Sequence, residues 1–124
     1  MLKRLSLALL LAVIAFGVAA QTAKKGANGG DVVVMDRHPI EFVGKDRDIT
    51  FYILDEDGQT PVPTNGLTGR AVVQDGGKTT TVNLSPAEPN KFFGHLAMPL
   101  GSKARVVFSA KVAGHNLQAR FIAD

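Results

Sequence analysis

Residues 48–58 read D-I-T-F-Y-I-L-D-E-D-G, and this stretch decides the fold. Side chains alternate between the two faces of a β-strand, which places Ile49, Phe51 and Ile53 on one face. The other face is mostly apolar as well, so we expect a strand that is covered on both sides or lies near the middle of a sandwich. The acidic segment 55–58 ends in glycine and is typical of a turn. The stretch therefore predicts the central strand of a small β-domain.

Shorter apolar runs surround this stretch, and none shows the periodicity of an amphipathic helix. Proline-rich segments at 59–69 and 85–90 predict crossovers between two sheets, and His38-Pro39 is expected to interrupt the first strand. The pattern predicts an all-β fold, an antiparallel β-sandwich of seven or eight strands with immunoglobulin-like connections. A closed barrel is the alternative. The other expected strands are 32–35, 40–44, 70–74, 79–84, 90–98, 103–112 and 117–122.

The first twenty residues have the pattern of a cleavable signal peptide. Lys3 and Arg4 precede an apolar centre, and Val18-Ala19-Ala20 supplies the small residues that a signal peptidase accepts. The apolar part is shorter than the roughly 20 residues that span a bilayer, so an uncleaved anchor is the lesser alternative. We therefore predict a periplasmic protein that does not span the membrane after cleavage. Residues 21–30 are expected to be a flexible leader, and 31–124 a single β-sandwich domain.

Composition narrows the classes of function. The chain has 14 Lys and Arg against 11 Asp and Glu, and removal of residues 1–20 takes away two basic residues and leaves 12 against 11. A nearly neutral mature chain without a basic patch of interleaved aromatic residues does not predict a nucleic-acid partner. The chain has no cysteine, which excludes both a disulfide framework and a lipid-modified cysteine at the cleavage point.

Histidine and methionine are the candidate metal ligands. The segment 35–38 places a thioether, a carboxylate and an imidazole within four residues, and His95 lies three residues before Met98. Thioether suits Cu(I), and imidazole suits Cu(II), nickel or zinc. We predict a metal site of His38, Met35 and His95, and a transition metal such as copper is the expected cofactor. His115 could replace His95, and Asp36 or Glu41 could complete the site; the alternative is surface histidines and core methionines without metal.

Other chemistries lack a motif. Asp55, Glu56 and Asp57 lack the twelve-residue ligand spacing of a calcium loop and are expected to form a solvated turn. The chain contains no G-x-S-x-G, P-loop, H-E-x-x-H or G-x-G-x-x-G motif and no cysteine nucleophile. We therefore do not predict an enzyme.

Several short segments together resemble a group of small exported proteobacterial proteins. The matching segments are G-G-D-V-V at 29–33, H-P-I-E-F-V at 38–43, L-D-E-D-G at 54–58, V-N-L at 82–84 with P-A at 86–87, and A-R-F at 119–121. The chain is similar to β-sandwich modules found alone or fused to periplasmic adaptor subunits of heavy-metal efflux systems. It resembles more distantly the copper-resistance and YtkA-like immunoglobulin-fold domains.

The resemblance implies a periplasmic accessory role in handling copper, nickel, cobalt or zinc, with a membrane efflux complex as partner. His38 is the one histidine inside a matching segment, and the chain lacks the N-terminal histidine and methionine-rich loop of the copper-resistance pattern. The competing hypothesis is a metal-free interaction module that docks an envelope complex through a strand edge or an aromatic face that includes Tyr52 and Phe93. Clustering of His38, His95 and His115 would favour the first hypothesis.

Overall fold

The computed structural model describes residues 24–124, so the predicted signal peptide and residues 21–23 of the predicted leader lie outside the described residues. Within 24–124 the fold is all-β, as expected. No helix in this part of the chain has the length and apolar character needed to cross a membrane. The strands are β1 (Lys24–Lys25), β2 (Asp31–Met35), β3 (His38–Lys45), β4 (Asp48–Ile53), β5 (Gly69–Asp75), β6 (Lys78–Ala87), β7 (Lys91–His95), β8 (Arg105–Val112) and β9 (His115–Ile122).

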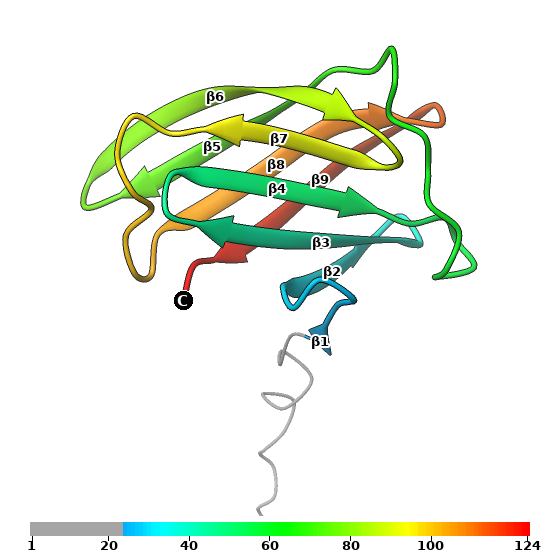
Figure 1. The fold of residues 1–124 in the computed structure, drawn as a ribbon, viewed down its shortest axis with the longest axis horizontal. Coiled ribbons are helices and arrows are strands. Elements are labelled where there is room, and N and C mark those ends of the chain that lie inside the picture. Colours follow the sequence, from blue (N-terminus) through cyan, green and yellow to red (C-terminus); the bar gives the residue numbers. More distant parts are fainter. Residues whose placement is uncertain (1–23) are drawn as a thin grey trace, which may run out of the picture.

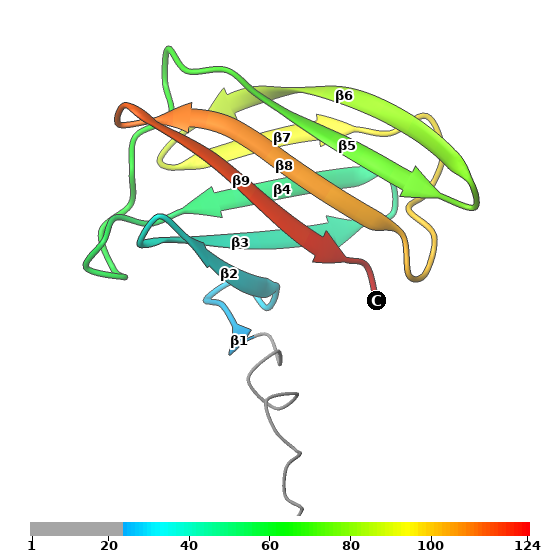
Figure 2. The same ribbon diagram turned by 180° about the vertical axis from the view of Figure 1, so that it is seen from behind.

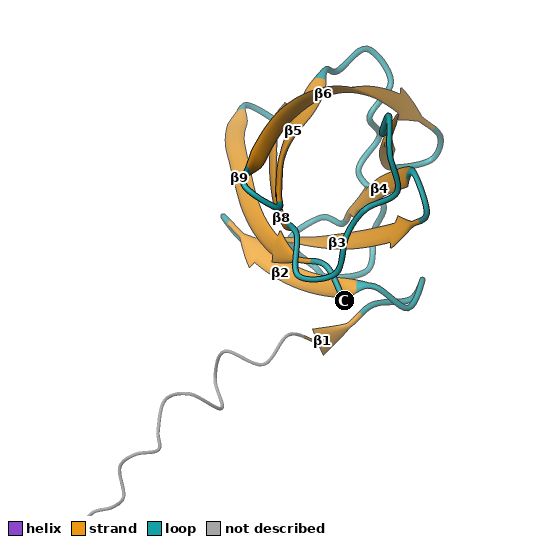
Figure 3. Cartoon of the chain, turned by 90° about the vertical axis from the view of Figure 1, so that its left-hand side faces the viewer, coloured by secondary structure: helices purple, strands orange, loops and turns teal. Residues whose placement is uncertain are grey.

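The nine strands form one antiparallel sheet in the order β1-β2-β3-β4-β7-β6-β5-β8-β9, which curls into a half-barrel (Figures 1 and 3). Strand β6 joins the two halves, because residues 78–84 pair with β5 and residues 85–87 pair with β7. The expected count of seven or eight strands is therefore too low. Because β6 pairs with β5 and also with β7, it connects the two parts into one sheet, and the fold is not clearly a sandwich of two separate sheets. Strands β2 and β9 lie close together, but the described residues form no ladder between them.

Strand β4 lies between β3 and β7, which confirms a central position for the stretch that decides the fold. Ile49, Phe51 and Ile53 have no exposed surface. Thr50 and Tyr52 on the opposite face are only half-buried, so of the two expected arrangements, the strand covered on both sides is not the one found. A half-barrel has a single interior, and only the inward face of each strand reaches it.

Aromatic rings fill this interior between the two halves of the sheet. The ring of Phe51 stacks on Phe108 at a centroid distance of 4.6 Å, and it lies 5.2 Å from Phe42 and 5.9 Å from Phe121. Phe92 contacts Phe108 at 5.7 Å. Aromatic pairs at such distances add about 0.5–1.5 kcal/mol each beyond the area that they bury. The cluster therefore ties β3, β4 and β7 to β8 and β9.

The chain crosses between the halves at three places. The predicted crossover at 59–69 lies in the connection from β4 to β5. The one predicted at 85–90 begins where β6 leaves β5 and pairs with β7, but it is made by a continuous strand and not by a loop. The third crossover, the segment 96–104 from β7 to β8, was not predicted. Proline lacks a backbone donor, and Pro86 lies where β6 leaves β5 and begins to pair with β7.

Part of the predicted leader is packed on the outer face of the sheet. Lys24–Lys25 pair with β2, and the turn that follows is held by Glu41, a buried carboxylate. Its oxygens accept hydrogen bonds from Asn28 N at 2.9 Å, Asn28 Nδ2 at 3.0 Å and Gly30 N at 2.7 Å. A Cβ atom on Gly30 would lie 2.0 Å from the Phe42 carbonyl oxygen, so glycine is required for this close approach.

Candidate metal centre

Two tight hairpin turns lie at one end of the half-barrel. Asp36 and Arg37 connect β2 to β3 with φ of 50° and 71°, and Ala113 and Gly114 connect β8 to β9 with φ of 52° and 81°. Positive φ at both central residues is the geometry of the two-residue turn that matches the twist of paired strands. Both turns, and the loop at 54–60 after β4, are at the right-hand end of Figure 1 and the left-hand end of Figure 2.

The alternation of side chains directs two histidines toward each other. His38 begins β3 and lies on the same face as the buried Ile40, while His115 begins β9 and lies on the same face as the buried Leu117. Both imidazoles therefore face the interior of the half-barrel at its end. Their ring centroids are 5.8 Å apart.

Glu56 completes a group of three ligand-bearing side chains. One imidazole nitrogen of His38, one of His115 and one carboxylate oxygen of Glu56 all lie within 4.8 Å of one another. His38 is 2% exposed, whereas the side chains of His115 and Glu56 are 43% and 46% exposed. The group thus has a buried side and a side open to solvent.

Hydrogen bonds determine which nitrogen each histidine presents. The Nδ1 atom of His38 lies 2.9 Å from the carbonyl oxygen of Leu54, and since a carbonyl only accepts, Nδ1 carries the proton. The Nδ1 atom of His115 lies 2.5 Å from a carboxylate oxygen of Asp36. In each neutral ring Nε2 then keeps its lone pair. An oxygen acceptor on the second ring nitrogen is the usual support of a metal-binding histidine.

Charge at the site favours a cation. Asp36 and Glu56 bring two carboxylates, and Arg37 brings one guanidinium, whose Nη1 lies 3.6 Å from Oε1 of Glu56. With neutral imidazoles the group has a net charge of −1. Arg37 competes with a metal for Glu56, but its side chain is 79% exposed and such surface ion pairs are worth about 0–1 kcal/mol.

The loop that presents Glu56 is held by its neighbour Asp57. Its carboxylate accepts hydrogen bonds from the backbone of Gln59 at 2.9 Å, from the backbone of Thr60 at 2.8 Å, and from the Thr60 hydroxyl. The Thr60 hydroxyl bond, followed by the two backbone bonds, lowers the pKa of Asp57 below its ordinary value of 3.8. The loop is closed further by Asp55 N, which donates to the Thr60 carbonyl at 2.7 Å.

This arrangement predicts an unusual pH range for the order of the loop. Because the folded pKa of Asp57 is depressed, its support is present above the ordinary value of 3.8 and is lost only as the pH falls through the lower folded pKa. In an NMR titration, the amide signals of Gln59 and Thr60 should therefore change at a pH below 3.8. Thr60→Val removes the hydroxyl hydrogen bond, which is the largest cause of the lowered Asp57 pKa, so the change in the amide signals should occur at a higher pH. An identical midpoint in both proteins would contradict the role of the Thr60 hydroxyl.

The structure brings some of the predicted ligands together and separates others. Met35 lies directly opposite His38 in the β2–β3 ladder, on the same face of the sheet, and is partly buried against the core. His95 is the last residue of β7 and lies opposite Asp48, at the end of β4 that is remote from His38. Its Nδ1 lies 2.6 Å from Oδ1 of Asp48. Glu41 points to the outer face and is already bonded to the leader turn. His115 and Asp36, the sequence-based alternatives, are at the site.

Two imidazoles and a carboxylate suit zinc, nickel or Cu(II), and a thioether at Met35 would add affinity for copper. The three ligand atoms lie within 4.8 Å of one another, whereas the ligands of a tetrahedral zinc are roughly 3.3 Å apart. Rotation of the half-exposed Glu56 side chain can bring its carboxylate closer to the two imidazoles. Three protein ligands would leave a position open on the solvent side, which is the arrangement of an exchangeable site.

Glu56 is the residue that the metal prediction from sequence missed, because its acidic segment is typical of an ordinary turn. Its only signal was its place in a loop directly after the central strand. Comparisons with known proteins add nothing to this assignment: no protein-family model matches the chain, and no curated protein or solved structure matches it significantly.

Proposed function

We propose that this protein binds one divalent transition-metal ion through His38, His115 and Glu56, and that it acts as a non-catalytic accessory protein in transition-metal handling or efflux. The observation that carries the proposal is a pair of inward-facing imidazoles that lie close to the Glu56 carboxylate. The Nδ1 atom of each imidazole is already bonded to another oxygen acceptor. The ion could be zinc, nickel or copper, with Met35 as an additional ligand for copper.

Accessory work in the periplasm is supported by the signal-peptide pattern of residues 1–20 and by the resemblance of segments such as 38–43 to efflux-adaptor modules. A protein that passes an ion to a membrane efflux complex needs a site that a partner can reach. His38 would anchor the ion from the interior, while Glu56 and His115 lie on the exposed side from which the ion would leave.

The proposed fold within the all-β class is a variant of the immunoglobulin-like sandwich. Two overlapping Greek-key arrangements support it, because β7 lies beside β4 and β8 lies beside β5. In this interpretation β2, β3, β4 and β7 form one layer, β5, β8 and β9 form the other, and the long strand β6 changes layer where it changes partner.

The second candidate function is a metal-free module that docks an envelope complex. It is supported by the outer face of β4, where the half-buried Tyr52 lines a groove of about 350 Å³ together with Val32, Pro39 and Leu54. Phe93 is half-buried on the same face of the neighbouring strand β7. An apolar groove beside an aromatic ring suits an extended peptide.

Native mass spectrometry of the purified protein, titrated with Zn(II), Ni(II), Cu(II) and Cu(I), tests the proposal. We expect one ion per chain for at least one of the divalent metals. Glu56→Gln should weaken binding because it removes the charged ligand, whereas Arg37→Gln, which removes the competing cation, should preserve or strengthen it. A loss of Cu(I) alone in Met35→Leu would assign the thioether as a copper ligand.

Absence of any stoichiometric ion in the wild-type protein would reject the metal-binding function and leave the interaction module. Equal binding by the wild-type protein and Glu56→Gln would place the ion elsewhere.

A further inference from the structure

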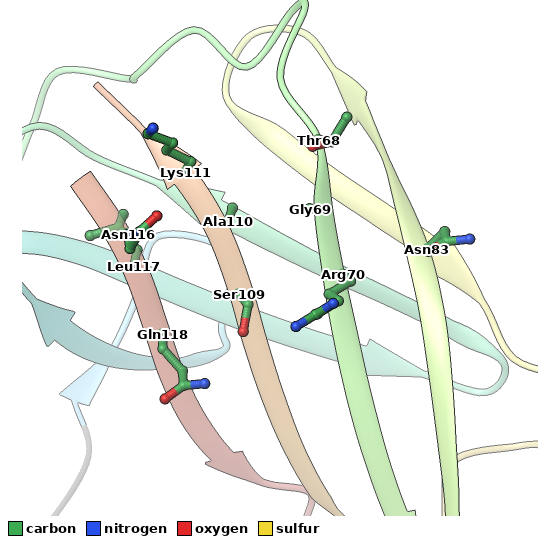
Figure 4. A pocket seen from close by; sticks show the side chains of 10 residues that line it. All are labelled: Thr68, Gly69, Arg70, Asn83, Ser109, Ala110, Lys111, Asn116, Leu117 and Gln118. Carbon is green, nitrogen blue, oxygen red and sulfur yellow. The ribbon is translucent and has the colours of Figure 1, made fainter. Parts of the chain in front are cut away.

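The outer face of the β6-β5-β8-β9 half has a hollow that is lined mostly by polar side chains (Figure 4). One row of outward side chains runs across all four strands in register: Gln118 lies opposite Ser109, Ser109 opposite Arg70, and Arg70 opposite Asn83. These residues, with Lys111 and neighbouring polar side chains, line a groove of about 620 Å³. The groove is on the opposite side of the sheet from the core.

Positive charge is concentrated on this face. Arg70, Arg105, Lys111 and Arg120 all occupy outward positions, which alternate with buried residues along β5, β8 and β9. None of the outward positions of these strands, or of β6, holds Asp or Glu. No ion pair within residues 24–124 involves any of the four cations. The face is therefore a set of cations without internal partners.

The acidic residues are elsewhere in the fold. Residues 24–58 contain eight Asp and Glu against five Lys and Arg, while residues 59–124 contain three against seven. Residues 24–124, which are nearly neutral with 12 basic and 11 acidic residues, are thus divided into an acidic first part and a basic second part. Such a division directs an anionic partner to the basic face.

The shape of the face and its neutral side chains indicate the class of anion. From Lys111 to Arg105 the cations follow β8 for about 20 Å. This length suits an extended polymer with repeated charges better than a single small anion. Besides Arg70 and Lys111, the groove is lined by side chains with amides and hydroxyls, which offer hydrogen bonds to hydroxyl groups. No aromatic side chain of residues 24–124 lines it, so this part of the chain provides no stacking platform for nucleobases.

We propose that this face binds an acidic polysaccharide, with Arg70 and Lys111 pairing with the carboxylates of uronate residues and the neighbouring amides and hydroxyls bonding to sugar hydroxyls. Asn83 and Ser109 flank Arg70 directly in the ladder and are placed for this purpose. The site is independent of the metal centre, because its side chains are on the outer face of the sheet, whereas His38 and His115 are on the inner face.

Binding of fluorescent alginate oligosaccharides to the purified protein tests the proposal, with neutral dextran as the reference ligand. We expect the Arg70→Gln/Lys111→Gln variant to bind alginate about tenfold or more weakly, because two charge-assisted contacts are lost. The Lys24→Gln/Lys45→Gln variant makes the same change in net charge on the other half and should bind as the wild-type protein does. Affinity should fall as salt is added.

Three results would overturn the proposal. They are no binding of alginate by the wild-type protein, equal weakening in both double variants, or equal or tighter binding of single-stranded DNA or anionic phospholipid vesicles than of alginate.

Discussion

We expect the Phe51→Ala variant to unfold with a free energy about 3–5 kcal/mol lower than that of the wild-type protein. Phe51 has no exposed surface and contacts the rings of Phe42, Phe108 and Phe121. The substitution leaves a cavity where the two halves of the sheet meet, and the β-ladders on both sides limit its collapse. Since small domains are stable by only about 5–15 kcal/mol in total, the loss should be visible directly in urea denaturation.

Tyr52→Ala is the matched control, because Tyr52 is the next residue on the same strand and points to the half-buried outer face. Its replacement should cost about 1 kcal/mol. Similar losses at Phe51 and Tyr52 would show that the interior of the half-barrel is not the main source of stability.

The second large effect is expected at the metal centre. His115→Ala should weaken binding of the preferred divalent ion about 100-fold or more, because it removes a ligand rather than a supporting contact. Isothermal titration calorimetry of the purified protein measures this change. His115 is the better test than His38, because its side chain is 43% exposed and its loss leaves no buried backbone carbonyl without a partner.

His95→Ala provides a closely matched control. Both histidines are partly exposed and hold a carboxylate through Nδ1, His95 with Asp48 at 2.6 Å and His115 with Asp36 at 2.5 Å. Only His115 lies near a second imidazole and Glu56. Equal effects of the two substitutions would mean that the ion is held by scattered surface histidines.

The central strand could be predicted from sequence because its signal is local. Alternating apolar residues followed by an Asp-Gly turn determine a strand and its end, and Ile49, Phe51 and Ile53 are buried as expected. The crossovers were harder to predict. Pro86 is compatible with either a loop or a strand that changes partners, and only the pairing of β6 with both β5 and β7 distinguishes them.

The metal centre was partly predictable for the same reason. Met35 and His38 are joined by a two-residue turn, so the local sequence alone predicts that they lie close together. His115 is 77 positions further along, on a strand that does not pair with β3, and the order of strands in the sheet decides whether it meets His38 or His95 does. The position of Glu56 depends on the path of the loop after β4, and the alternation of apolar residues that predicts strands does not predict the path of a loop.

The central claim is that two imidazoles bind one ion, and the X-ray absorption spectrum of the zinc-loaded protein at the metal edge tests it most directly. The account predicts two imidazole ligands at about 2.0–2.1 Å with oxygen in the remaining positions. It also predicts one imidazole for His115→Ala and two for His95→Ala. A spectrum without imidazole scattering, or one that loses an imidazole in His95→Ala but not in His115→Ala, would contradict it.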